Sequence, residues 1–100
     1  MDFQVFLSRE ALSDLEHIVA YIALHNATAA ERMGHLLLNA ALSLNTFPER
    51  GRVVPEFQRP DLREIMVRSY RLIYRLNHEG KRLEVVRFWH AARGFPHIPH

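Results

Sequence analysis

The last third of the chain, residues 63–93, contains three short runs of alternating side chains with only tight turns between them. Successive side chains of a strand point to opposite faces, so the three runs predict a meander of three β-strands. One face of the middle run is apolar and aromatic, whereas the other carries Arg71 and Arg75. The sequence therefore predicts a sheet with a cationic surface, which either meets an anionic or acidic partner or is simply solvated.

Two helices are predicted before this sheet. Apolar residues recur every three or four positions in residues 9–25 and again in residues 28–47. Ser8 is the expected N-cap of the first helix, and Thr28 with Glu31 forms a capping box that would start the second. The short link between them predicts an antiparallel hairpin. Its buried stripe is expected to contain Leu15, Ile18, Ile22, Met33, Leu37 and Leu44.

The remaining segments complete the predicted fold. Residues 3–7 form a first strand that is too apolar on both faces for an exposed edge and should pair with the later sheet. Three prolines and one glycine in residues 48–61 predict an irregular loop. The expected fold class is α+β, with the order β-α-α-β-β-β and the helical hairpin packed on a twisted, antiparallel-rich sheet. Residues 1–95 make one domain, and residues 96–100 a flexible tail.

Composition excludes several kinds of site. The chain has no cysteine, which excludes disulfides, thiolate metal ligands and a cysteine nucleophile. Its seven histidines lack the spacing of a zinc site, so we expect no metal and no cofactor. No apolar run approaches the roughly 18 residues of a membrane span, and no signal peptide is recognisable. We therefore expect a cytoplasmic protein without a membrane partner.

The basic residues are unusual in type and position. All but one of the 13 lysines and arginines are arginine, and most of them lie between residues 52 and 93. Because the planar guanidinium pairs bidentately with carboxylate or phosphate, this bias favours nucleic acid or an acidic protein segment as partner. The arginines of the 48–61 loop are more simply interpreted as solvated charges.

One catalytic design remains compatible with these residues, namely metal-free cleavage of a phosphodiester. His90, at the end of the last strand, would serve as general base or acid, because imidazole exchanges protons near neutral pH. Four arginines could hold the phosphate: Arg71, Arg75, Arg87 and Arg93. A lone histidine at a strand end is more often structural, however, and Trp89 and Tyr70 are more simply core residues than base-stacking platforms.

Four segments in this order, DLEHIVAYIALHN, FPERGRVVPE, REIMVRSYRLIYRL and VVRFWHAAR, resemble the RelE/ParE superfamily of bacterial type II toxins across nearly the whole chain. The resemblance implies the toxin of a plasmid-stabilisation-like toxin-antitoxin system. Its partner would be a cognate antitoxin, whose disordered carboxy-terminal segment folds over the toxin. Arg52, Arg71 and Arg75 are the residues expected to bind this antitoxin.

The superfamily implies two targets. ParE-like members block DNA gyrase, whereas RelE-like members cleave mRNA on the ribosome. The FPERGR and YRLIYR motifs are closer to the ParE branch, which favours a gyrase inhibitor that binds its target through Trp89, His90 and Arg93. The alternative is an endoribonuclease that uses His90, Arg71 and Arg87, so the sequence leaves open whether the protein is an enzyme. A third hypothesis is an inactive member that serves only as antitoxin-binding and corepressor subunit.

Overall fold

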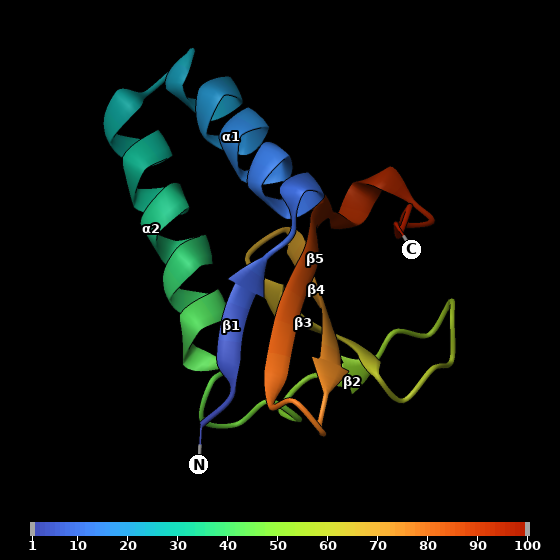
Figure 1. Ribbon diagram of the computed structural model, residues 1–100. Helices are drawn as coiled ribbons and strands as arrows, with labels where there is room; N and C mark the ends of the chain where they lie inside the picture. The colour runs from blue at the N-terminus through green and yellow to red at the C-terminus, as the bar shows by residue number, and fades with distance from the viewer. Residues whose placement is uncertain (1, 100) are drawn as a thin grey trace.

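A computed structural model of the chain describes residues 2–99. Its elements are β1 (Gln4–Leu7), α1 (Arg9–Ala23), α2 (Ala27–Ser43), β2 (Arg52–Val53), β3 (Leu62–Val67), β4 (Tyr70–Asn77), β5 (Arg82–His90) and the short 3-10 helix η1 (Ala91–Arg93). The five strands form one sheet in the order β1-β5-β4-β3-β2. Only the β1–β5 pair is parallel. Figure 1 shows both helices on one side of this sheet, which confirms the predicted α+β class and helical hairpin.

The helix starts are set by side-chain caps. Ser8 caps α1 as predicted, because its hydroxyl oxygen accepts from the Ala11 N–H at 3.0 Å. The predicted capping box of α2 is wrong. Asn26 is the N-cap, since its Oδ1 accepts from the Ala29 N–H at 2.9 Å, and Thr28 lies inside the helix.

Both helices end earlier than predicted. The first ends at Ala23 rather than His25, and the second at Ser43 rather than Phe47. After Ser43 the chain turns toward the first strand, where the Asn45 carbonyl accepts from the Phe3 N–H at 3.0 Å. This contact draws the chain away from the helix axis, so the apolar spacing that continues to residue 47 does not extend the helix.

The first strand pairs with the later sheet as predicted, but it does not lie in the interior. It occupies an edge and contacts β5 alone among the strands. Val5 and Leu7 pack against the helix-side core, while Phe6 points to the other face and is 39% exposed. The Arg82 guanidinium lies 4.4 Å from the centre of the Phe6 ring. This cation–π contact covers the apolar side chain that had argued against an edge position.

The sheet is buried on both faces. On the helix side, a large cluster joins the two helices to the strands and includes Leu15, Leu37, Leu44, Leu72, Tyr74, Leu83 and Phe88. Ile18 and Met33 pack against this cluster, whereas Ile22 is half-buried beyond it. A second cluster on the opposite face contains Val54, Leu62, Ile73, Val86 and Trp89. The face of β4 that was expected to be cationic therefore carries a core of its own.

The 48–61 loop is more regular than predicted. Arg52–Val53 forms β2, which pairs antiparallel with β3. The Tyr74 hydroxyl donates to the Pro48 carbonyl at 2.7 Å and accepts from the Gly51 N–H at 2.9 Å. A Cβ at Gly51 would lie 2.5 Å from a backbone oxygen of β3. Glycine is required there because the loop backbone approaches the sheet too closely for any side chain.

The segment after η1 contacts the second cluster. Pro96 is buried and Ile98 packs against the cluster, although a flexible tail was predicted here. Arg87 Nη1 donates to the His97 carbonyl at 2.9 Å, and Arg75 Nη2 donates to the Pro99 carbonyl at 3.1 Å. Residues 1 and 100, which the predicted domain and tail include, lie outside the described residues. Within residues 2–99, no helix has the length and apolar character that a membrane crossing requires.

The packing predicts that truncating two leucines of α2 lowers the free energy of unfolding by unequal amounts. Leu37 is 0% exposed and Leu42 is 55% exposed. We expect Leu37→Ala to lower the free energy of unfolding by about 2–5 kcal/mol, because the truncation leaves a cavity. Leu42→Ala should change it by less than about 0.5 kcal/mol. Chemical denaturation of both variants measures the difference, and equal losses would contradict the packing described here.

Candidate functional site

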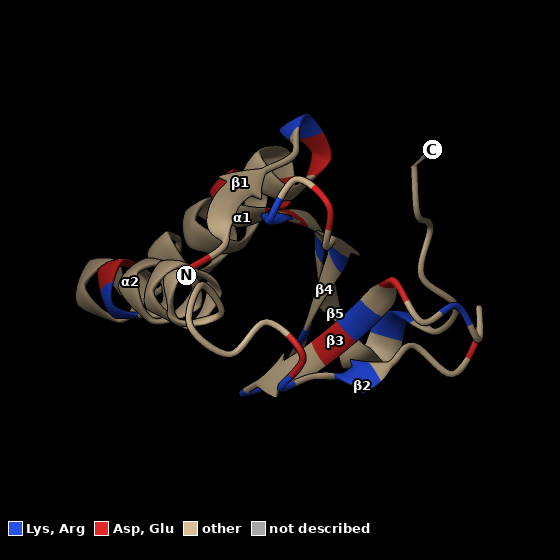
Figure 2. Cartoon of the chain, turned by 60° about the horizontal axis from the view of Figure 1, so that its bottom comes forward, with Lys and Arg blue, Asp and Glu red and all other residues tan. Residues whose placement is uncertain are grey.

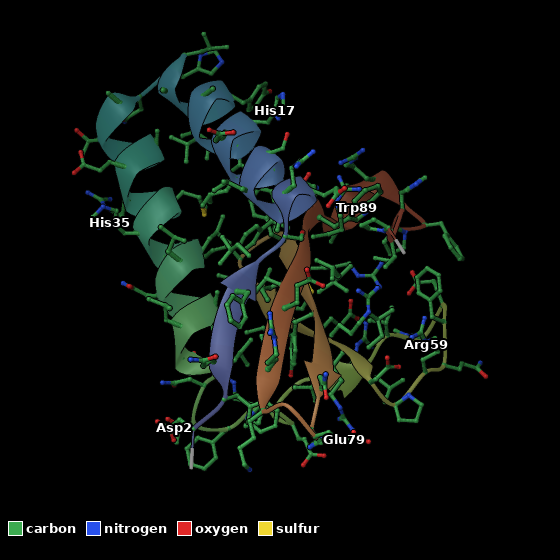
Figure 3. The ribbon with its side chains drawn as sticks, viewed as in Figure 1. Asp2, His17, His35, Arg59, Glu79 and Trp89 are labelled. Atoms are coloured by element: carbon green, nitrogen blue, oxygen red, sulfur yellow. The ribbon has the colours of Figure 1, made fainter. Side chains whose placement is uncertain are left out.

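An open cleft of about 670 Å³ lies where α1 passes the carboxyl end of β5. Residues from α1, β4, β5 and η1 line it: Ser13, Asp14, His17, Ile18, Tyr21, Tyr70, Arg87, Phe88, His90 and Arg93. In Figure 3, His17 marks the α1 side, and Trp89 lies beside the β5 side. The cleft thus brings together three of the sequence-predicted site residues, Arg87, His90 and Arg93. Its volume falls in the range of small-molecule sites.

A salt bridge forms one wall of the cleft. Arg87 Nε and Nη2 each donate to a carboxylate oxygen of Asp14 at 2.7 Å. Asp14 Oδ2 also accepts from the Phe88 N–H at 3.0 Å. The hydrogen bonds that Arg87 donates to Asp14 raise the pKa of Arg87, although its burial opposes the shift. The pair holds α1 against β5 and neutralises the charge of Arg87.

Arg93 is the second arginine of the cleft. Its guanidinium carbon lies 3.8 Å from the centre of the Trp89 ring, so the two groups stack. Among residues 2–99, no carboxylate lies within ion-pair distance of Arg93. With Arg87 neutralised by Asp14, the cleft therefore carries about one net positive charge.

The two histidines of the cleft present opposite hydrogen-bonding groups. His90 Nδ1 accepts from the Ala92 N–H at 3.1 Å, so the proton of a neutral His90 lies on Nε2. His17 Nδ1 lies 2.7 Å from the Ser13 carbonyl oxygen, which can only accept, so Nδ1 carries the proton and Nε2 keeps its lone pair. His17 thus offers an acceptor and His90 a donor. In this arrangement Nε2 of a neutral His90 can donate a hydrogen bond to a ligand, and Nε2 of a neutral His17 can accept one.

Two tyrosines complete the aromatic wall. The Tyr70 ring meets the His90 ring edge to face, with the centres 5.1 Å apart and the planes at 82°. Burial raises the pKa of Tyr70, so its hydroxyl remains a donor at neutral pH. Tyr21, from α1, is 68% exposed. Together with the histidines, these residues give the cleft four exposed or half-buried rings.

Arg71 lies outside this cleft. It is 8% exposed and is held in an ion-pair cluster formed by Arg52, Glu56, Glu64 and Arg71. Its Nε donates to Glu64 at 2.6 Å, and its Nη1 and Nη2 donate to Glu56 at 2.8 and 2.7 Å. The Glu56 hydrogen bonds, followed by those of Glu64, raise the pKa of Arg71 despite its burial. Arg71 is therefore a structural cation rather than an exposed anion-binding group.

The other arginines proposed for partner binding are also paired. Arg52 donates to Glu64 at 2.7 Å from the edge of the cluster, but its side chain remains 65% exposed. Arg75 donates to Glu84 at 3.2 Å. Figure 2 shows basic and acidic positions side by side on the strands. The predicted cationic face is thus largely neutralised by the protein's own carboxylates.

The sequence analysis did not single out five of the ten cleft residues, and three of these five form a stripe on α1. Asp14, His17 and Tyr21 follow one another at spacings of three and four on α1, which places them on one face of the helix. This polar and aromatic stripe adjoins the apolar one and could have been noticed. Nothing in the spacing indicates that it meets β5, which lies more than 60 residues away in the sequence. No group of three potential metal ligands occurs in residues 2–99.

The chain matches a known protein family over most of its length. A family model described as ParE toxin of type II toxin-antitoxin system, parDE, matches residues 5–95. The chain is 35% identical to Toxin RelE1 of Caulobacter vibrioides over 91% of its length and 96% of the relative. It is 39% identical to Toxin RelE2 of the same organism over 90% of its length and 97% of the relative.

Solved structures share the fold. The chromosomal ParDE system of P. aeruginosa matches with a TM-score of 0.72 at 19% identity, over 88% of this chain and 95% of that one. The toxin-antitoxin complex RelBE2 of Mycobacterium tuberculosis matches with a TM-score of 0.69 at 19% identity, over 90% and 99%. At this identity the likeness concerns the fold alone.

The ion-pair cluster predicts a pH dependence of stability. The hydrogen bond from Arg71 lowers the pKa of Glu56 below its ordinary value of 4.5. A carboxyl group whose pKa is lower in the folded than in the unfolded protein stabilises the fold at pH values above its unfolded pKa. This stabilisation is lost as the pH falls through its folded pKa. Glu56→Gln should therefore be less stable than wild type at neutral pH, and the difference should shrink well below pH 4.5.

Chemical denaturation at both pH values measures this difference. Glu79→Gln is the matched control, because Glu79 lies exposed in the β4–β5 turn (Figure 3) and makes no ion pair within residues 2–99. We expect its stability to follow wild type at both pH values. If Glu56→Gln were less stable than wild type by the same amount at both pH values, the loss of stability would not come from the titrating carboxylate.

Proposed function

Because the chain belongs to the ParE toxin family of type II toxin-antitoxin systems, within the RelE/ParE superfamily, we propose that this toxin inhibits DNA gyrase by binding it. The observation that carries the proposal is the separation of the residues a nuclease would need. Arg71 is buried in the ion-pair cluster, and His90 and Arg87 lie in the cleft. The three side chains do not converge on one position where a phosphate could sit.

The charges of these residues also favour a binding surface. Arg71 donates to two carboxylates of the same chain, and Arg87 donates to the Asp14 carboxylate and the His97 carbonyl, with distances of 2.6–2.9 Å. A group that stabilises charge in a transition state has to keep its donors directed at the substrate. Of the residues expected to bind gyrase, His90 and Arg93 are accessible, whereas Trp89 is 4% exposed and supports the Arg93 guanidinium from the second cluster. Arg93 is exposed and stacked, which is typical of an interface anchor.

A RelE-like ribosome-dependent mRNA endoribonuclease is the second candidate. Two observations favour it: the relatives at 35% and 39% identity are named RelE toxins, and the cleft holds two imidazoles, one offering a hydrogen-bond acceptor and the other a donor. In this alternative His17, rather than His90, would be the general base. An inactive member that only binds antitoxin and acts as corepressor is the third possibility.

We also propose a cognate antitoxin as partner, because the two solved structures described above are named as toxin-antitoxin assemblies. Its carboxylates would bind Arg52, Arg71 and Arg75. Arg52 is the most accessible of the three, at 65% exposure of the side chain, whereas Arg71 would have to exchange Glu56 for a partner carboxylate. Carboxylates of the antitoxin would then replace the toxin's own carboxylates as ion-pair partners of these arginines.

The antitoxin proposal predicts a salt-dependent affinity. We expect binding of an acidic antitoxin segment to weaken as ionic strength rises, because exposed charges are screened over about 10 Å at 0.1 M salt. Arg52→Ala should weaken binding and reduce the salt dependence, whereas Arg32→Ala, on the exposed side of α2, should do neither. Calorimetric titration at low and high salt measures both effects. Equal affinities at both salt concentrations would refute the electrostatic contribution.

The gyrase proposal predicts graded effects on toxicity. His90→Ala and Arg93→Gln should each weaken inhibition of gyrase supercoiling by about tenfold, because an interface distributes its energy over several anchors. Arg32→Gln is the control. The same proteins are assayed on ribosome-bound mRNA, and no cleavage is expected. Cleavage by wild type that falls about 10²–10⁴-fold in a folded His17→Gln or His90→Ala variant would instead establish the nuclease.

A further inference from the structure

The cleft between α1 and β5 has the walls of a site for a planar ligand. His17 and Tyr21 approach it from the helix, and Tyr70 and His90 from the sheet. The edge-to-face contact of Tyr70 with His90 fixes the orientation of two of these rings. Aromatic rings held in this way stack on flat heterocycles with little dependence on their identity. The shape therefore favours a planar, aromatic group.

The hydrogen-bonding groups add a second requirement. His17 Nε2 presents a lone pair and His90 Nε2 presents a proton, as their contacts with Ser13 and Ala92 determine. The ligand should therefore carry both donors and acceptors on its edge. A purely apolar ligand would leave both nitrogens without partners, which costs free energy. Nucleobases combine a flat ring with both kinds of group.

The charge adds a third requirement. Asp14 is the one carboxylate in the lining, and Arg87 and the Phe88 N–H already occupy it. Arg93 has no carboxylate partner within residues 2–99 and lies at the rim of the same cleft. A single free guanidinium suits one phosphate group. An anion alone would use Arg93 but leave the rings and imidazoles unused.

We propose that this cleft is a nucleotide-binding site, in which the base stacks between the aromatic rings and the phosphate binds Arg93. His17 and His90 contact the edge of the base as acceptor and donor. The site shares His90 and Arg93 with the gyrase-binding region proposed above, so a bound nucleotide and gyrase would compete for these two side chains. The source is either a free nucleotide or the exposed base of a single strand, which share this chemistry.

Calorimetric titration of the full chain tests the site with four probes: AMP, adenosine, inorganic phosphate and the trinucleotide ApApA. We expect AMP to bind with a dissociation constant of about 1 mM or tighter, and about tenfold more tightly than adenosine or phosphate alone. A trinucleotide that binds about tenfold more tightly than AMP identifies a single strand as the source. Equal affinities identify the free nucleotide.

Variants separate the three contributions. Arg93→Gln should weaken AMP about tenfold and leave adenosine unchanged, because only the phosphate loses its partner. His90→Asn should weaken both ligands, since asparagine can keep the cap on Ala92 but removes the ring. His17→Phe retains a ring and loses the acceptor, so it should also weaken both. Arg32→Gln, on α2, is the control and should bind as wild type.

Three results would overturn the proposal. The first is no binding of AMP or ApApA at about 10 mM, far above the expected dissociation constant. The second is phosphate binding as tightly as AMP, which would leave an anion site only. The third is an equal loss of AMP and adenosine in Arg93→Gln. Supercoiling assays on the same preparations distinguish this failure from failure of the gyrase proposal, because a toxin that inhibits gyrase without binding nucleotide refutes the site alone.

Discussion

The contact between Asp14 and Arg87 is the interaction on which the arrangement of the molecule depends. Ser8 ties the start of α1 to β5, since its N–H and its hydroxyl donate to the Val85 and Val86 carbonyls, but the helix beyond Ser8 has no backbone pairing with the sheet. The carboxylate receives three donors, two from the guanidinium and one from the Phe88 backbone, which fixes the helix at one position. The cleft exists because of this fixed position. One of its walls comes from α1, and the other from β4, β5 and η1.

The sequence predicts the elements well and their contacts less well. Alternation and helical spacing locate the strands and helices because these periods reflect local backbone geometry. Asn26 and Thr28 are both good caps, and the choice between them depends on where the chain turns between the helices. Ile73 has the same parity as Arg71 and Arg75 and was therefore expected on the cationic face. Val54 and Ile98, which pack in the same cluster as Ile73, lie in segments whose composition predicts no regular structure.

The candidate site shows the same limit. Parity along β4 correctly places Arg71 and Ile73 on one side of the strand, but it does not reveal what lies opposite. Glu56 comes from the loop and Glu64 from β3, and the pairing of β3 with β4 brings Glu64 to Arg71. The hydrogen-bonding roles of His17 and His90 depend on a backbone carbonyl and a backbone amide. Such contacts follow from tertiary structure and leave no pattern in the sequence.

The parallel pairing of β1 with β5 has a consequence for the synthesis of the protein. Val5 pairs with Leu83, and the Ser8 hydroxyl donates to the Val86 carbonyl across 78 positions of sequence. Strand β1 is synthesised first, but it cannot pair until β5 has been synthesised near the end of the chain. Contacts of such long range form late in folding. Neither the helix-side core nor the cleft is complete while β5 remains inside the ribosome. The residues proposed to contact a target are therefore brought together only after β5 has left the ribosome.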